Sequence, residues 1–442
     1  MGWTSLCPLG NTYAQSQQNP PPASLRENPD STSHRPPERD ESRAERWRQK
    51  RRAKRQEMQP PEPGFFERVG HFVSRIRGSV APRRLLLTAP KLDVAGVNVL
   101  VDELAPPAGG LLYEPPPLND ETRLVSLEAT AGLNGKYDTE ALFGFETDRY
   151  VGYTYGRYRH TPEEVVYGLG PDSRLASESA FRRTEGIFGG LFGRSLAPQM
   201  LLGGHVSYQI NRVGAGRGDL PSVQDRLGGS LPGANRNIDY FMVGSFFEYD
   251  ARDTPYERAF GHRFAPTENR LRSVSLEATR GFYLAAEATH NVDHRHSALN
   301  FTRFTVDMRE FLPINEELLH GFAFRQFASV TRSSNGQMPF YRMPTLGGSR
   351  SLRGYRTNRF RDRNVVLMNA EVRCEIWHRL DMALFADAGH IFRNVNDLEM
   401  LNPHVGYGVG FRFKKNGQTL GRLDFAHSGE GLQTTLDIGS LF

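Results

Sequence analysis

Arginine and carboxylate side chains are concentrated in one part of this sequence, and they are its strongest candidates for specific chemistry. Residues 346–363 read LGGSRSLRGYRTNRFRDR, a glycine- and arginine-rich stretch without helical periodicity. Beyond it, Glu371 and Asp387 each lie in a strand-like segment. Guanidinium and carboxylate groups make strong, directional hydrogen bonds where water is partly excluded. Such residues form either a buried anchor or an exposed salt bridge of little energetic consequence, and the elements that carry them decide between the two.

Other groups of reactive residues favour turns over active sites. The imidazole and carboxylate groups near 290–296 have metal-binding chemistry, but they lie at the expected end of a strand, and we interpret them as an exposed loop. Residues 250–253 end an apolar strand and favour a turn network. The glycines of 168–173 and 189–193 precede no helix that would bind phosphate, and no serine lies in a nucleophile-elbow context. We therefore expect no enzyme activity, no metal and no cofactor. The metal candidates weighed are His290, Asp293, His294 and His296.

Alternating hydrophobicity places the two carboxylates on strands. Apolar and polar residues alternate through 365–377, and Glu371 lies on the polar face. A period of two over this length predicts a strand with one apolar and one polar face. The segment 382–391 is predicted to be a second strand, in which Asp387 shares a face with Phe385. The apolar face of the first segment consists of Val366, Met368, Ala370, Val372, Cys374 and Ile376.

Similar segments follow one another from residue 123 to the end, each about 10 residues or somewhat longer, the length that crosses a bilayer when tilted. The mean hydropathy is −0.53. This value and the lack of a long apolar run exclude an ordinary helical span but not a membrane β-barrel, whose alternating strands average to a polar composition. A soluble sandwich or propeller is the alternative, but the continuous apolar face favours an all-β, transmembrane antiparallel β-barrel of about 16 strands. About fifteen segments show the pattern: near 123–132, 138–146, 149–160, 178–193, 198–213, 237–251, 269–279, 281–291, 300–311, 318–331, 364–377, 381–392, 404–414, 419–427 and 432–442.

The segments before residue 123 are expected to lie outside the barrel. Residues 1–14 resemble the end of a truncated signal peptide, with cleavage after Ala14. Residues 15–63 are rich in Pro and Arg and nearly empty of aliphatic side chains, so we expect them to be disordered. Residues 64–122 are predicted to begin with a short amphipathic helix and to continue as a periplasmic segment without an assigned fold. The basic run at 35–55 has no accompanying nucleic-acid motif, and we interpret it as a solvated tail.

Several motifs resemble the BamA/TamA superfamily of outer-membrane assembly and translocation barrels, which includes compact surface-antigen proteins. The resemblance covers 123–442. It implies a barrel of about sixteen strands in which a long loop folds into the lumen and its motif arginine meets acidic residues on the inner strand faces. On this chain the loop anchor would be Arg353 with Gly354 and Tyr355, and its partners Glu371 and Asp387. The motifs are GGSRSLRGY, NAEVR, LFADAGHIF, GYGVGFRF, VYGLGPDS and EYDARDTPYERAFG.

The resemblance also implies a location in the bacterial outer membrane and a function in assembling or inserting other outer-membrane proteins. Expected partners are outer-membrane lipid, nascent outer-membrane proteins, and periplasmic or lipoprotein partners, with no nucleic acid. Leu436, Ile438 and Phe442 of the closing strand resemble the family's insertion signal. Residues 15–118 show no pattern of the POTRA domains that receive clients in this family. A polypeptide-secretion or passive solute channel, and a structural surface barrel without insertase activity, therefore remain as alternatives.

Overall fold

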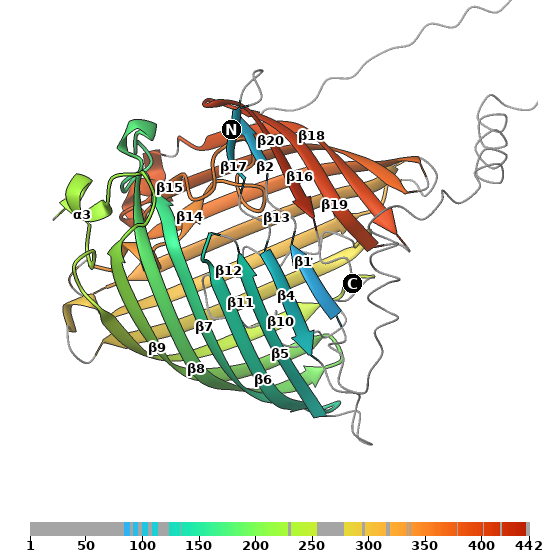
Figure 1. The fold of residues 1–442 in the computed structure, drawn as a ribbon. Helices are drawn as coiled ribbons and strands as arrows, with labels where there is room; N and C mark the ends of the chain where they lie inside the picture. Colours follow the sequence, from blue (N-terminus) through green and yellow to red (C-terminus); the bar gives the residue numbers. More distant parts are fainter. Residues whose placement is uncertain are drawn as a thin grey trace, which may run out of the picture. The chain divides into compact units, whose positions relative to one another are not determined.

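The structure is a computed structural model, and the residues that it describes lie between 84 and 438 (Figure 1). The expectations of a signal peptide in 1–14, a disordered region in 15–63 and an amphipathic helix near 64–78 lie outside the described residues. The described residues are 84–88, 92–95, 100–104, 108–113, 123–132, 134–228, 231–253, 278–293, 297–314, 319–333, 335, 337–377, 379–400, 402–415 and 418–438.

Fourteen strands from residue 123 onward form one antiparallel sheet that curves into a transmembrane β-barrel (Figure 1). Among the described residues, no helix is long and apolar enough to cross a membrane. The strands are β5 (Arg123–Gly132), β6 (Tyr137–Glu146), β7 (Tyr150–Val166), β8 (Ser179–Ala197), β9 (Met200–Ala215), β10 (Ile238–Asp250), β11 (Gly281–Asp293), β12 (Phe301–Leu312), β13 (Leu319–Arg332), β16 (Asn364–Trp377), β17 (Leu380–Phe392), β18 (His404–Lys415), β19 (Gln418–Ser428) and β20 (Gly431–Ile438).

Short elements complete the described part of the chain. Most of them lie in the connections at one end of the barrel, between the long strands. They are the helices η1 (Leu175–Ser177), α3 (Val223–Arg226), η3 (Ser297–Leu299), η4 (Phe340–Arg342) and η5 (Val395–Met400), and the strands β1 (Arg84–Thr88), β2 (Leu92–Ala95), β3 (Leu100–Leu104), β4 (Ala108–Tyr113), β14 (Thr345–Leu346) and β15 (Phe360–Arg361).

The four strands between residues 84 and 113 extend both ends of the sheet. Strand β4 pairs with β5, and β1 pairs with β4. Strand β2 instead pairs with the last strand, β20, and β3 pairs with β2. Sequence analysis had left this part of 64–122 without a fold, because its short apolar runs are broken by Pro and Gly. The structure makes it the seam where the first and last long strands approach each other.

The strand expected near 269–279 falls almost entirely outside the described residues and stays a prediction. Strands β10 and β11 pair directly with each other, from Tyr240 opposite Asp293 to Asp250 opposite Tyr283. Residues 254–277 lie outside the described residues, and 278–280 are not strand. Because β10 and β11 share a full ladder, no further strand lies between them in the sheet.

The two faces of β16 and β17 match the alternation predicted from the sequence. On β16 and β17, the side chains of Met368 and Leu384 are exposed by 59% and 55%, although both are apolar. Their neighbours on the opposite face, Glu371 and Asp387, are buried. Apolar side chains on the outside and charged ones within is the arrangement of a membrane barrel, where lipid covers the outer face.

We predict that a charge on the outer face destabilises the barrel in lipid. Val243 lies near the middle of β10 and is 49% exposed, whereas Val395, in η5, is 48% exposed outside the long strands. Val243→Arg should lower the free energy of unfolding by about 2–4 kcal/mol, because its cation would enter the hydrocarbon layer. Val395→Arg is the matched control and should leave stability nearly unchanged. Urea titration in lipid vesicles measures both, and equal stability of the two variants would contradict the lipid-facing assignment.

Candidate functional site

The long connection between β13 and β16 is a folded loop with its own small ladder and core. Strands β14 and β15 close it on itself, with Thr345 opposite Arg361 and Leu346 opposite Phe360. Leu346 and Leu352 are fully buried and belong to one apolar cluster with residues of β13, β16 and β17. A loop that buries apolar side chains of its own can hold a fixed conformation. We call residues 337–363 the inner loop.

The inner loop reaches strands on opposite parts of the sheet. Arg342, which is 1% exposed, donates from Nη1 to Oε1 of Gln209 at 2.6 Å and from Nη2 to Oδ1 of Asn291 at 3.1 Å. These partners lie on β9 and β11, whereas Arg353 of the same loop contacts β16 and β17. Contacts with strands this far apart in the sheet place the loop within the barrel lumen.

Arg353 binds Asp387 through one edge of its guanidinium group, the edge formed by Nε and Nη2. Nε donates to Oδ2 and Nη2 donates to Oδ1, each at 2.7 Å, and the backbone N–H of Arg353 also donates to Oδ2 at 3.0 Å. Asp387 is 1% exposed and faces inward from β17. A bidentate guanidinium–carboxylate pair fixes direction as well as distance, which a lysine ammonium would not do.

Glu371 is shared by three arginines. Nη1 of Arg353 donates to Oε2 at 2.8 Å, Nε of Arg373 to Oε1 at 2.8 Å, and Nη2 of Arg412 to Oε2 at 3.1 Å. Arg412 also donates from Nη1 to Oδ1 of Asp424 at 2.5 Å. The network therefore links the inner loop to inward positions on β16, β18 and β19. Buried charges persist only where they are paired and hydrogen-bonded in this way.

An aromatic ring completes the surroundings of Arg353. Its guanidinium carbon lies 3.5 Å from the ring centroid of Phe385, which is the inward neighbour of Asp387 on β17. Burial alone would lower the pKa of Arg353, but the charge of Asp387, its hydrogen bonds and the charge of Glu371 raise the pKa above its ordinary value. The guanidinium group consequently stays charged, and it can stack on the ring and bind both carboxylates at once.

The backbone of the inner loop around Arg353 lies close to the backbone of β18 and β19. Gly354 has a φ of +89°, and its carbonyl accepts a hydrogen bond from the Ser428 hydroxyl at 2.5 Å. The hydroxyl of Tyr355 donates to the carbonyl of Val405 at 3.4 Å, and its ring meets Phe360 edge-on. On β18, a Cβ added to Gly406 would overlap the carbonyl oxygen of Arg353. The loop thus lies directly on the strand backbone, which glycine permits.

The structure brings Arg353, Glu371 and Asp387 together, with Gly354 and Tyr355 beside them. Leu436 and Ile438 lie apart from this network, on β20, and Phe442 is outside the described residues. Sequence reasoning missed the remaining members. All of them face inward from their strands. The hydrophobic alternation of each strand indicates this inward face but does not distinguish these residues from others on it. The missed residues are Arg373, Phe385, Gly406, Arg412, Asp424 and Ser428.

No metal site emerges in the described part of the chain. No group of three or more His, Cys, Asp or Glu side chains there could hold an ion. Nδ1 of His290 lies 2.8 Å from the Thr302 hydroxyl oxygen, and the backbone N–H of Asp293 donates to Asn300 at 2.7 Å. His294 and His296 lie outside the described residues.

The Omp85 superfamily domain matches residues 177–433, more than half of the chain, and this range contains the whole inner-loop network. The chain belongs to the Omp85 superfamily. BamA from Haemophilus ducreyi lacking POTRA domains 1-3 has a similar structure, with a TM-score of 0.54 and 11% sequence identity over 84% of this chain and 78% of that chain. CdiB from Acinetobacter baumannii has a TM-score of 0.49 and 9% sequence identity, over 80% of this chain and 59% of that chain. CdiB from Escherichia coli has a TM-score of 0.48 and 12% sequence identity, over 80% of this chain and 62% of that chain. No curated protein sequence matches the chain.

These matches confirm the family and the fold expected from the sequence. This Omp85 protein is a barrel of the bacterial outer membrane and is surrounded by outer-membrane lipid. Its function, at this level, is that of an outer-membrane barrel protein. The expectation that 15–118 contains no POTRA domain concerns residues that lie mostly outside the described ones, and it stays a prediction.

We predict that Arg353→Ala lowers the free energy of unfolding by about 3–5 kcal/mol, because a buried carboxylate loses its cation. Glu371 would keep Arg373 and Arg412, so Asp387 is the group left without a guanidinium. Arg353→Ala with Asp387→Ala should therefore be less destabilised than Arg353→Ala alone. Urea unfolding in vesicles, with heat-modifiability of the folded band, measures both. Unchanged stability of the single variant would contradict the energetic role of this pair.

A second prediction concerns the seat of the loop on β18. Gly406→Ala should destabilise the barrel by about 1–3 kcal/mol, because the new methyl group collides with the Arg353 backbone. Gly429→Ala is the matched control, since its Cβ would meet only the Tyr355 hydroxyl, at 3.7 Å. Protease digestion of the inner loop in folded protein reports whether the loop has been displaced. A Gly406→Ala loop as resistant as that of Gly429→Ala would refute the close contact.

Proposed function

We propose that this Omp85 barrel assists the folding and membrane insertion of other outer-membrane proteins. In the proposed mechanism, its seam opens sideways and β20 pairs with an incoming client strand, which needs backbone partners before it can enter lipid. No cofactor takes part. Unfolded outer-membrane proteins are the clients, and periplasmic or lipoprotein partners would deliver them.

The observation that carries this proposal is the weak closure of the seam. Strand β20 has 8 residues, and its partner on the seam side, β2, has only 4. Among the described strands, β1 and β3 each pair with one neighbour only, so the sheet has a free edge at both ends. A short ladder loses few hydrogen bonds when it opens, and an edge strand readily pairs with another chain.

The inner loop supports the seam from within. Arg412 on β18 and Asp424 on β19 belong to the Arg353 network, and Ser428 at the end of β19 binds the carbonyl of Gly354. Strand β19 is the other neighbour of β20. We assign the Arg353 anchor the role of holding β16 to β19 in register, so that opening is confined to the β20–β2 side. Leu436, Ile438 and Phe442 are assigned to the closing-strand signal.

The second candidate, a secretion or passive solute channel, is less well supported. The inner loop packs against β9, β11, β16 and β17 from within the lumen, and its aromatic residues belong to buried clusters. A lumen filled by a folded loop does not favour passive flow of solutes. A structural surface barrel without insertase activity would share this feature, so function must be measured on clients.

The test is to lock the seam. Val94 and Thr434 are opposite each other on β2 and β20, within the usual reach of a disulfide between paired strands. Val94→Cys with Thr434→Cys, in a Cys7→Ser, Cys374→Ser background, would be reconstituted in proteoliposomes and given an unfolded outer-membrane barrel. Oxidation should reduce the rate at which folded, protease-protected client forms to that of empty vesicles, and dithiothreitol should restore it.

The matched control shares one cysteine with the lock. Phe425→Cys with Thr434→Cys joins β20 to β19, where no opening is proposed, and it should insert clients equally well when oxidised or reduced. A β2–β20 lock that inserts clients as fast when oxidised as when reduced would contradict seam opening. Absence of acceleration by the unlocked protein would contradict insertase activity altogether, and conductance in planar bilayers would then distinguish a channel from a structural barrel.

A further inference from the structure

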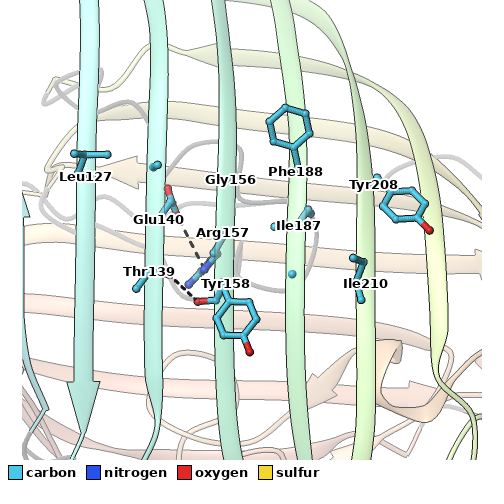
Figure 2. Close-up of a pocket in the computed structure, with 12 residues that line it drawn as sticks. Leu127, Thr139, Glu140, Gly156, Arg157, Tyr158, Ile187, Phe188, Tyr208 and Ile210 are labelled. Atoms are coloured by element: carbon cyan, nitrogen blue, oxygen red, sulfur yellow. Dashed lines mark hydrogen bonds and ion pairs between the residues drawn. The ribbon is translucent and has the colours of Figure 1, made fainter.

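A groove of about 620 Å³ crosses the outer surface of the barrel over β5 to β9 (Figure 2). Its outward side chains are almost all apolar, and several are unusually exposed, up to 68% for Phe188. The strands beneath it are already paired on both edges, so no further strand can be added there. The outward side chains that wall it are Leu127, Tyr158, Phe188, Tyr208 and Ile210.

Glycines form the floor of this groove. Gly156 is paired with Phe188 on β8, and Gly186 is paired with Tyr158 on β7. A Cβ added to either glycine would meet only the ring of its paired aromatic residue, at 3.9 Å. Two missing side chains beside two large rings therefore create a depression that a narrow apolar chain can fill.

One outward position beyond the groove on the same strands, the side chains are polar or basic. His160, Thr184 and Arg212 lie side by side on β7, β8 and β9, and Nδ1 of His160 is 2.8 Å from the Thr184 hydroxyl oxygen. Arg182 is the next outward residue beyond Thr184 on β8, and its guanidinium group lies against Gly214 of β9. The backbone N–H of Arg217 donates to the carbonyl of Pro162, two residues beyond His160, at 3.3 Å. A basic rim thus borders one end of an apolar groove.

Two carboxylates partly balance this rim. Asp239 binds Arg212 at 2.5 Å, and the carboxylate of Glu163 lies against Gly218. The rim therefore has one excess positive charge beside the groove, from three arginines and two carboxylates: Arg182, Arg212 and Arg217 with Asp239 and Glu163. The rim lies toward the ends of β7, β8 and β9 that continue into the longer connections 167–178 and 216–237. Longer loops mark the extracellular side of an outer-membrane barrel, which places the rim at the outer leaflet.

We propose that this groove binds one acyl chain of a phosphorylated lipid of the outer leaflet, whose phosphate lies at Arg182 and Arg217. The groove is continuous with the lipid-facing surface, so lipid chains already surround it. A groove without a free strand edge suits an acyl chain better than a client strand. The excess positive charge at the rim complements a phosphate, with which arginine makes charge-assisted hydrogen bonds.

The test uses purified full-length protein and lipid A as the probe, with binding measured by native mass spectrometry from detergent. Gly186→Leu fills the groove and should weaken lipid A binding about tenfold, because the acyl chain loses buried contact. Gly190→Leu is the matched control: it lies on the same strand and face, outside the groove, and its Cβ has ordinary contacts from 3.5 Å. It should bind lipid A like the wild type.

The phosphate contact has its own pair of variants. Arg182→Gln with Arg217→Gln should weaken lipid A binding about fivefold or more and should leave dephosphorylated lipid A unaffected. Arg194→Gln, at the opposite end of β8, is the control. Heat-modifiability verifies that each variant is folded, and Gly156→Leu replaces Gly186→Leu if the latter does not fold. Wild-type affinity of a folded, groove-filled variant would overturn the proposal, and so would equal binding of phosphorylated and dephosphorylated lipid A by the wild type.

Discussion

A buried positive charge is tolerated only where fixed negative charges surround it, and the inner loop depends on this constraint. Arg353 satisfies it by meeting Asp387 with two guanidinium nitrogens and Glu371 with the third. Because the carboxylates belong to different strands, the loop can neutralise its arginine only when β16 and β17 are in register. The position of the loop and the register of the strands therefore depend on each other. Arg412 likewise reaches Glu371 and Asp424 only when β16, β18 and β19 are aligned.

The strands were largely predictable because burial in a barrel wall has a local signature. The segment expected at 364–377 is the strand Asn364–Trp377, and Asp387 shares the inward face with Phe385 as its position in the alternation required. The alternation overlooked the short strands of 84–113, one of which, β2, pairs with residues of β20 that lie hundreds of positions away.

The site was predictable only in part, for a related reason. A motif identified Arg353, and periodicity placed Glu371 on an inward face, but neither tells how strands are aligned with one another. Arg412 comes within reach of Glu371 only through the register of three consecutive strands. The stacking of Phe385 on Arg353 likewise requires the loop conformation. Contacts that depend on several registers at once cannot be read from the period of any one strand.

The hairpin of β2 and β3 is joined through 89–91 to β1 and through 105–107 to β4, so both of its ends are tethered on the far side of the seam. A strand held this way competes for β20 at the effective concentration of a tethered ligand, about millimolar for short flexible linkers. A free strand at cellular concentration displaces it only by forming a longer ladder than the 4 residues of β2 provide. Under the proposed function, the β2–β3 hairpin thus sets a length threshold, which short or poorly paired peptides do not pass.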